Sequence, residues 1–321
     1  MSTVTRRRPA GHLRARRRMS STQTLLEILE TEYFALNVRI RAEQTRNQYR
    51  YSLQNLADFL GRPPTMADLS DDTVIRLTLY LRDVKHLDPR TCNDRRGRIN
   101  ALWTWLSNKG RCSTRPTNAA LAVPRKIPRA WKHDELQRLM RACATTPGTA
   151  GTLPASTFWL AFHAICWDTA ARTTEILSLR WEWLDWSTGW IRVPPDVRKG
   201  GVKEAAYRVM SDTLALLATF RKPTGLILGF AKDRSRIWQM YKELLERAGL
   251  PATRHDGPQK MRRSHASWLA ANHGDATLSL LHDDASTTRK FYLDPTITQH
   301  TSPSAQLPFR LLDLRNDPST Q

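Results

Sequence analysis

The chain has 321 residues, of which 40% are hydrophobic, so it is long enough for two domains and apolar enough to bury a core. It carries 50 Lys and Arg against 30 Asp and Glu, a formal net charge of +20. A positive surplus of this size favours a polyanionic partner, because each phosphate that a protein neutralises releases condensed counterions. No apolar run is long enough to span a bilayer, and the N-terminus lacks an apolar signal core, so we expect a cytoplasmic protein without a membrane partner.

Charge alone leaves several classes open, since ribosomal and membrane-surface proteins share it. Eleven tryptophans and strong helical patterns favour a folded enzyme or binding domain over a basic tail protein. The cysteines have no CxxC spacing, and no Asp/Glu cluster has the spacing of a two-metal nuclease site, so the sequence predicts neither a metal site nor a cofactor. We expect four reduced, mostly structural thiols: Cys92, Cys112, Cys143 and Cys166.

Residues 1–20 contain seven arginines and no acidic residue, which predicts a disordered basic arm. Such an arm is a solvated tail, a non-specific phosphate-binding segment, or both. A mitochondrial transit peptide is a weaker alternative, because the arm has little amphipathic order.

Residues 21–112 have helical periodicity and predict an all-helical domain of about four helices. The segment "TRNQYRYSLQNLADFLG" ends at Gly61, as helices often do, and "SDDTVIRLTLYLRDV" opens with a Ser/Asp cap. Residues 113–129 contain three prolines and several basic side chains. This composition predicts a linker or a strap lying along DNA. We expect DNA contacts from basic residues of these segments: Arg46, Arg50, Arg95, Arg96, Arg98, Arg125 and Lys126.

Residues 130–300 form the second predicted domain, and residues 301–321 a tail with weak periodicity. Helical segments in this domain are interrupted by "GWIRVPPDVRKGGVKEAAYRVMSD", where alternating apolar residues and a basic, glycine-containing turn predict a small antiparallel hairpin. The predicted fold is therefore mainly α with one small β-hairpin sheet. A helical DNA-binding domain precedes a mixed α+β domain.

Arg172 stands at the start of a predicted helix, with Glu175 three residues later, in "TAARTTEILSLRW". An isolated pair of this spacing is normally an exposed ion pair. Here the pair lies in the most hydrophobic part of the chain, where an unpaired charge is costly, so these two residues are candidates for a functional site.

Three segments together resemble the tyrosine recombinases, the phage integrase family. "TAARTTEILSLRWEWLDWSTGWIRV" is similar to the first motif box of that family, "QKMRRSHASWL" to the second, and "LLHDDASTTRKFYLDP" to the third, which ends in the nucleophilic tyrosine. The boxes occur in the family's order around a hairpin lysine, and the helical domain resembles the family's core-binding domain. The resemblance covers about residues 20–300.

This resemblance implies that Arg172 and Arg262 grip the scissile phosphate, since a guanidinium fork matches phosphate oxygens and keeps its charge. Lys199, in the hairpin turn, would protonate the 5′-oxygen leaving group, with Lys203 as the alternative. Tyr292 would be the nucleophile, and a phenol needs a cationic pocket or a base to attack.

His282 fits the histidine of the third box, although Leu281 stands where the family usually has glycine. In the second box the family usually has a histidine where this chain has Gln259, which can donate a hydrogen bond but cannot shuttle a proton. Lys260 beside it could supply charge. Further residues have supporting roles in this interpretation: Glu175 orients the cations, His265 packs behind Arg262, and Arg263 contacts the DNA backbone or an acidic partner.

The resemblance implies a metal-independent, site-specific recombinase that cuts and rejoins double-stranded DNA through a 3′-phosphotyrosine intermediate. The working unit would be a homotetramer on two DNA sites, associated with the nucleoid, and residues after Thr296 are candidates for a segment exchanged between protomers. Two alternatives stay open: a catalytically weak DNA-binding protein on the same fold, and a DNA-relaxing enzyme similar to type IB topoisomerases.

Overall fold

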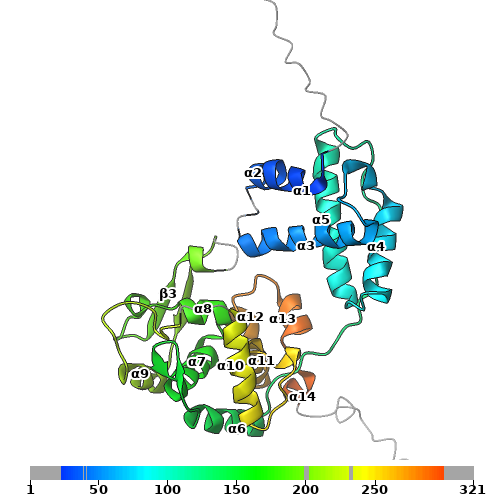
Figure 1. Cartoon of the computed structure of the whole chain (residues 1–321). Helices are drawn as coiled ribbons and strands as arrows, with labels where there is room; N and C mark the ends of the chain where they lie inside the picture. The colour runs from blue at the N-terminus through cyan, green and yellow to red at the C-terminus, as the bar shows by residue number, and fades with distance from the viewer. Residues whose placement is uncertain (1–22, 39, 41, 199–201, 231–233, 300–321) are drawn as a thin grey trace, which may run out of the picture. The chain divides into compact units, whose positions relative to one another are not determined.

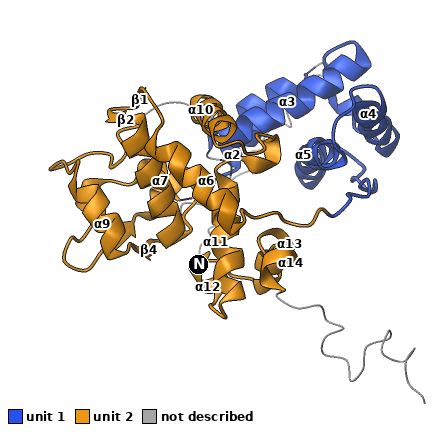
Figure 2. Ribbon diagram, turned by 90° about the horizontal axis from the view of Figure 1, so that it is seen from below, with its two compact units in different colours: residues 1–125 blue, residues 126–321 orange. Residues whose placement is uncertain are grey.

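The computed structural model of the chain describes residues 23–38, 40, 42–198, 202–230 and 234–299. The predictions for the basic arm, for Lys199 and for the C-terminal tail lie outside these residues. The chain divides into two compact units, residues 1–125 and 126–321, which Figure 2 colours separately. Each unit has its own hydrophobic core.

The secondary-structure elements described in the first unit are all helical (Figure 1). A 3-10 turn, η2, joins two of its helices, and a π-helical turn, η1, interrupts the first helical run. The elements are α1 (Leu25–Ile28), η1 (Leu29–Tyr33), α2 (Phe34–Leu36), α3 (Glu43–Leu60), η2 (Met66–Asp68), α4 (Asp71–Asp83) and α5 (Pro89–Asn108).

Local signals in the sequence account for the ends of these helices. Thr24 and Glu27 form a capping box at the start of α1, with each side chain bonded to the other residue's backbone N–H. The side chain of Ser70 caps α4 by accepting from the N–H of Thr73. Helix α3 ends at Gly61, whose φ of 70° is a conformation that glycine adopts without a steric cost.

Hydrogen bonds fix the segment that follows α5 onto the first unit. The carboxylate of Asp71 accepts from the backbone N–H groups of Thr117 and Asn118, both at 3.0 Å. The amide of Asn93 exchanges two bonds with the backbone of Leu121, each of 2.8 Å. The predicted linker is therefore held by the first unit as far as Leu121.

The second unit combines helices with two small antiparallel sheets. The helices surround α7, which packs against α6, α8, α9 and α11. The elements are α6 (His133–Ala144), β1 (Thr149–Ala150), β2 (Leu153–Pro154), α7 (Ala155–Thr169), α8 (Thr173–Ser178), η3 (Trp181–Trp183), β3 (Trp190–Val193), η4 (Pro195–Val197), β4 (Ala205–Arg208), α9 (Ser211–Ala218), α10 (Arg234–Arg247), η5 (Arg254–Asp256), α11 (Gln259–Ala271), α12 (Ala276–Ser279), α13 (Ala285–Phe291) and α14 (Pro295–Thr298).

Strands β3 and β4 form the predicted hairpin, paired antiparallel from Trp190 opposite Arg208 to Val193 opposite Ala205. Burial alternates along both strands, as the apolar–polar alternation requires. The mainly helical fold with a small hairpin sheet is thus confirmed. The sheet of β1 and β2 was not predicted, because strands of two residues leave no periodic pattern.

Helix α7 forms the centre of the second core, because most of its residues are apolar and buried. Phe158, Trp159 and Phe162 are buried and in contact with one another. The helix ends at Ala170, whose φ of 48° lies in the left-handed region that favours glycine. This turn releases the chain into α8 and the residues of the first motif.

Candidate active site

Arg172 is the N-cap residue of α8, and Glu175 lies one turn into the helix. The Nη1 group of Arg172 donates to Oε1 of Glu175 at 3.2 Å, and its backbone N–H donates to Oε2 at 3.1 Å. Glu175 is fully buried, whereas the Arg172 side chain is 27% exposed. The carboxylate therefore holds a guanidinium that still faces solvent.

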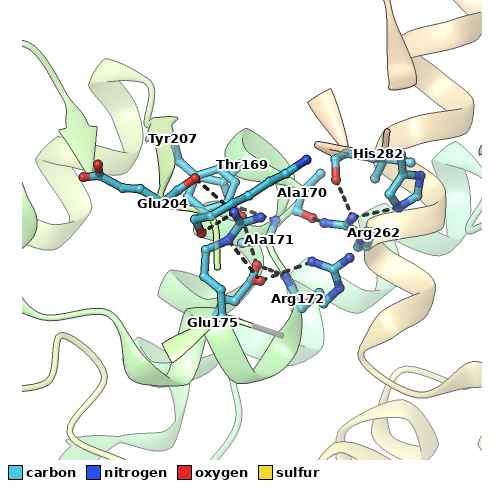
Figure 3. Close-up of polar contacts among 12 residues, drawn as sticks. Thr169, Ala170, Ala171, Arg172, Glu175, Glu204, Tyr207, Arg262 and His282 are labelled. Carbon is cyan, nitrogen blue, oxygen red and sulfur yellow. Dashed lines mark hydrogen bonds and ion pairs between the residues drawn. The ribbon is translucent and has the colours of Figure 1, made fainter. Parts of the chain in front are cut away.

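Two further groups bind the same carboxylate. The hydroxyl of Tyr207, from β4, donates to Glu175 at 2.9 Å (Figure 3). Nε of Arg198 lies 3.6 Å from Oε1, an ion pair without a hydrogen bond. Burial alone would raise the pKa of Glu175, but the bonds from Arg172 and Tyr207 outweigh burial and lower it. Burial first, and the charge and hydrogen bond of Glu175 second, raise the pKa of Tyr207 to about 12. Glu175 is thus an anion that links α8 to the β3–β4 hairpin.

Arg262, in α11, is 1% exposed and is held by backbone carbonyl groups from two other segments. Its Nη1 donates to the carbonyl of Ala170, and its Nη2 donates to the carbonyl of Leu280 at 2.7 Å. Its Nε–H is buried without a hydrogen-bond partner in the described part of the chain. Burial first and Arg172 second lower the pKa of Arg262, and Tyr292 opposes the shift. The two arginines of the first and second boxes therefore lie close enough to sense each other's charge (Figure 3).

Left-handed backbone flanks both carbonyls that hold Arg262. Ala170 has a φ of 48°, and Leu281, directly after Leu280, has a φ of 51°. Each conformation costs a residue with a Cβ free energy that glycine avoids. Leu281 stands where the family usually has glycine, and it adopts the left-handed conformation that glycine favours.

His282 lies between Arg262 and α13. Its Nε2 is 3.2 Å from Nη2 of Arg262, and its Nδ1 is 2.9 Å from the hydroxyl of Thr288. Burial, then the charges of Arg262 and Arg172, lower the pKa of His282. The imidazole is therefore neutral at neutral pH and can accept a proton.

Tyr292 follows α13 and stands against both of these groups. Its ring centroid is 4.7 Å from that of His282, edge to face, and 5.5 Å from the guanidinium carbon of Arg262. Its backbone carbonyl accepts from the hydroxyl of Ser267 at 3.1 Å, and that hydroxyl accepts from the N–H of Asp294 at 2.9 Å. The structure thus brings together Arg172, Glu175, Arg262, His282 and Tyr292, as the three boxes predict.

The second half of the predicted linker is bonded to this segment. The backbone N–H of Ala130 donates to the carboxylate of Asp294 at 2.8 Å, and that of Trp131 donates to the hydroxyl of Ser264 at 2.7 Å. Asp294 is buried and also caps α14. The chain that enters the second unit is therefore bonded to Asp294, two residues after Tyr292, and to Ser264, two residues after Arg262.

Lys203 is the one of the two candidate lysines that lies among the described residues. Its ammonium group is exposed and 2.5 Å from the carboxylate of Asp283, the neighbour of His282. The β3–β4 loop therefore reaches the third motif box through this pair.

The neighbours of Arg262 in α11 have distinct surroundings. Gln259 is exposed at the first position of the helix, and Nη2 of Arg263 donates to the carbonyl of His255 at 2.5 Å. Lys260 is buried, with its ammonium group 2.8 Å from Asp256. That ammonium also lies 3.3 Å from the centre of the Trp131 ring, so its charge is already compensated inside the protein.

His265 lies one turn after Arg262 in α11 and contacts two other helices. Its Nδ1 contacts the carbonyl of Trp167, and its Nε2 lies 2.7 Å from the hydroxyl of Ser279. Burial is the largest cause that lowers the pKa of His265. The residue joins α7, α11 and α12.

Several of the predicted DNA-binding residues of the first unit also make contacts within that unit. Arg50 pairs with Glu30 and Glu43, both at 2.5 Å, and Arg46 lies over the ring of Phe34. Three arginines of α5 donate hydrogen bonds to neighbouring groups: Arg95 to Gln48, Arg96 to Asn118, and Arg98 to the carbonyl of Asp94. Arg125 and Lys126 are exposed.

Three residues of the site were missed in the sequence: Arg198, Tyr207 and Asp294. Tyr207 and Asp294 are ordinary for a strand and a helix cap, so nothing local distinguished them. Arg198 had one signal, since it directly precedes the candidate Lys199 in "VRKGG".

The described residues contain no helix long and apolar enough to cross a membrane. Within the same residues, no group of three or more His, Cys, Asp or Glu side chains is arranged to hold a metal ion.

The family model described as the phage integrase family matches residues 129–297, more than half of the chain. The chain therefore belongs to the phage integrase family, and it is a site-specific recombinase of the tyrosine type. It is similar to the tyrosine recombinase XerC of Xanthomonas campestris pv. campestris (strain B100), with 27% identity over 234 residues, covering 68% of each chain. XerC of Xanthomonas axonopodis pv. citri (strain 306) is 26% identical over 297 residues, covering 84% of this chain and 91% of its own.

Two solved structures have the same fold. The Tn1549 transposon integrase in complex with a circular intermediate DNA matches with a TM-score of 0.65 and 11% identity, over 84% of this chain and 95% of that one. A lambda integrase dimer bound to a COC′ core site matches with a TM-score of 0.64 and 15% identity, over 85% of this chain and 96% of that one. At these identities the likeness is one of fold alone.

Proposed function

We propose that this recombinase cuts and rejoins double-stranded DNA through a 3′-phosphotyrosine intermediate on Tyr292. The observation that carries the proposal is the contact of the Tyr292 ring with both His282 and Arg262. A phenol beside a neutral imidazole and a guanidinium has a proton acceptor and an electrostatic partner within one site.

In the cleavage step, the phenol oxygen of Tyr292 bonds to phosphorus while the bond from phosphorus to the 5′ oxygen breaks. The phenol proton passes to Nε2 of the neutral His282, which must first release the hydrogen bond that it accepts from Arg262. The 5′ oxygen takes a proton from the ammonium of a lysine in the β3–β4 loop, Lys199 or Lys203, and leaves as a hydroxyl. A 5′-hydroxyl from the partner strand reverses these steps, so the energy of the phosphodiester bond is conserved.

Arg172 and Arg262 would stabilise the charge on the phosphate in the transition state. Arg172 is the more accessible of the two, with 27% of its side chain exposed, and it offers the first contact. Because Arg262 is 1% exposed, a neighbouring side chain must move before a phosphate oxygen reaches its unpartnered Nε–H. That buried N–H would then gain a charge-assisted hydrogen bond to the phosphate, which favours binding of the phosphate.

DNA is the partner that the charge of +20 favours, and the Tn1549 and lambda integrases of the same fold were solved with DNA. A homotetramer on two DNA sites, in the cytoplasm at the nucleoid, follows from the family resemblance. The basic arm, the linker and the predicted basic side chains of the helical domain would contribute phosphate contacts. Such contacts position the protein on DNA without reading the base sequence.

The test is a suicide substrate, a nicked DNA duplex from which the cleaved end diffuses away. Wild-type protein should form a covalent adduct with the cognate site, and Tyr292→Phe should form none. Failure of the wild type on every cognate site would favour the alternative of a binding-only protein. Relaxation of plasmid without sequence preference would favour a topoisomerase-like enzyme, although the comparisons support neither alternative.

A further inference from the structure

Arg198 is a partly buried arginine at the end of η4, where the chain leaves strand β3 for the loop that leads to β4. Its side chain is 10% exposed. Nη1 donates to two successive carbonyl groups, that of Lys203 at 2.9 Å and that of Glu204 at 3.0 Å. One guanidinium therefore joins residue 198 to the backbone of residues 203 and 204, just before β4 begins.

The other side of the same guanidinium faces the site. Nε of Arg198 is 3.6 Å from Oε1 of Glu175, the oxygen that also accepts from Nη1 of Arg172 at 3.2 Å. Glu175 is fully buried, so this carboxylate oxygen connects the two arginines away from bulk water. Arg172 and the backbone of Lys203 are thus joined through two charged groups, Glu175 and Arg198.

This chain of contacts links two parts of the reaction that must act together. Arg172 belongs to the proposed phosphate site, while the β3–β4 loop carries the lysine that would protonate the leaving oxygen. Proton transfer requires a donor within hydrogen-bond reach of the atom that it serves, so the place of the loop relative to the phosphate decides the rate.

We propose that Arg198 is a positioning residue that sets the β3–β4 loop, and with it the proton-donating lysine, relative to the phosphate held by Arg172. The guanidinium places its Nε 3.6 Å from the carboxylate while its Nη1 donates to the two carbonyl groups. Lysine has a single ammonium group and cannot span both. The inference rests on the proposed phosphotyrosine chemistry.

The experiment uses the full-length protein and a pair of nicked duplexes, one natural and one with sulfur replacing the 5′-bridging oxygen of the scissile phosphate. A thiol has a pKa of about 8.5, far below that of an alcohol, so the sulfur leaves without a proton donor. Arg198→Ala should slow adduct formation on the natural duplex by about 10- to 100-fold, within the usual contribution of acid–base catalysis. On the sulfur duplex its rate should return to within about threefold of wild type, because the misplaced acid no longer matters.

Two variants make the comparison specific. Arg172→Ala removes a phosphate contact and should stay impaired on both duplexes. Arg192→Ala removes an exposed arginine of the same hairpin and should behave as wild type on both. Arg198→Lys keeps the charge beside Glu175 and should show a partial loss that sulfur also corrects, which keeps the test available if Arg198→Ala fails to fold.

Equal loss by Arg198→Ala and Arg198→Lys on both duplexes would overturn the inference, since the arginine would then act through Arg172 or the fold. Unchanged cleavage of the natural duplex would overturn it as well. Failure of the wild type to form any adduct would instead refute the proposed function, and the role of Arg198 would fall with it.

Discussion

Arg262 donates a hydrogen bond from Nη2 to Nε2 of His282 over 3.2 Å. A guanidinium has only donors, so Nε2 must be the acceptor, and the imidazole carries its single proton on Nδ1. That Nδ1–H donates to the hydroxyl of Thr288 at 2.9 Å. The tautomer of His282 is therefore fixed by its two partners, with the lone pair on the side of Arg262.

The first prediction concerns the titration of His282. Burial and two cations lower its pKa below the ordinary value of 6.5, so the midpoint followed by imidazole NMR should lie below 6.5. Arg172→Ala removes one cation and should raise the midpoint, while Arg192→Ala should leave it unchanged. Cleavage should decline as the pH falls through this midpoint, because the imidazolium cannot take the phenol proton. A midpoint at or above 6.5 would contradict the lowering of the His282 pKa by burial and the two arginines.

The second prediction separates the adjacent arginines of α11. Arg262→Ala should reduce cleavage by about 10²- to 10³-fold with a modest loss of DNA binding, as for loss of a transition-state donor. Arg263→Ala is the matched control and should cost less than about tenfold, because its Nη2 is already bound to the carbonyl of His255. Arg262→Lys serves if the alanine variant is unstable. Equal losses of cleavage in Arg262→Ala and Arg263→Ala would contradict the assignment of the phosphate contact to Arg262 alone.

The third prediction assigns Lys260 to stability. Its side chain is 6% exposed and pairs with Asp256, which is 10% exposed, so Lys260→Ala leaves a buried carboxylate uncompensated. The free energy of unfolding in urea should fall by about 3–5 kcal/mol. A second variant that combines Lys260→Met with Asp256→Asn removes both charges and should recover much of that loss. A variant Lys260→Ala that is as stable as wild type but unable to cleave DNA would instead support a phosphate-binding lysine.

The sequence predicted the parts of this site that depend on local patterns. Helical periodicity placed Arg172 at the start of a helix, and the alternation after Trp190 predicted the hairpin, since both follow from repeat spacing. The predicted proximity of the three boxes came from family resemblance alone. It required tertiary packing that no local pattern encodes.

Contacts between distant segments could not be predicted in this way. Asp294 accepts a hydrogen bond from the backbone N–H of Ala130, 164 residues earlier. No sequence pattern identifies which backbone N–H a carboxylate will bind. Lys260 is charged and adjacent to Gln259, so the sequence suggested that it could supply charge to the site, but the fold surrounds it with Asp256 and Trp131. The left-handed turn at Leu281 was visible only as a departure from the family's glycine.

The fourth prediction follows from that turn. Leu281 has a φ of 51°, and a left-handed conformation costs a residue with a Cβ about 1–2 kcal/mol. Glycine removes this cost but gains about 0.5–1 kcal/mol of freedom in the unfolded chain. Leu281→Gly should therefore raise the free energy of unfolding by about 0.5–1 kcal/mol, whereas Leu278→Gly, at an exposed position inside α12, should lower it by about 1 kcal/mol. Destabilisation by both changes would show that Leu281 contributes more by packing than it costs in strain.

The fifth prediction concerns His163, a buried histidine of α7 that lies outside the active site. Its Nδ1 is 2.7 Å from the carbonyl of Trp159, while Nε2 has no partner among the described residues. Burial lowers its pKa from 6.5 to about 4. Between these two values the unfolded chain binds a proton that the folded chain refuses, so stability is complete above pH 6.5 and falls as the pH drops towards 4.

The loss from this one residue should reach roughly 3 kcal/mol at the acid end of that window. Other groups titrate there too, so the useful quantity is the difference between variants in urea unfolding measured from neutral pH downwards. His163→Leu should flatten the dependence of the unfolding free energy on pH, while His133→Leu, at an exposed position of α6, should not. If His163→Leu kept the slope of the wild type, the buried imidazole would be taking up its proton in the folded protein, and the core around α7 would have to admit a charge.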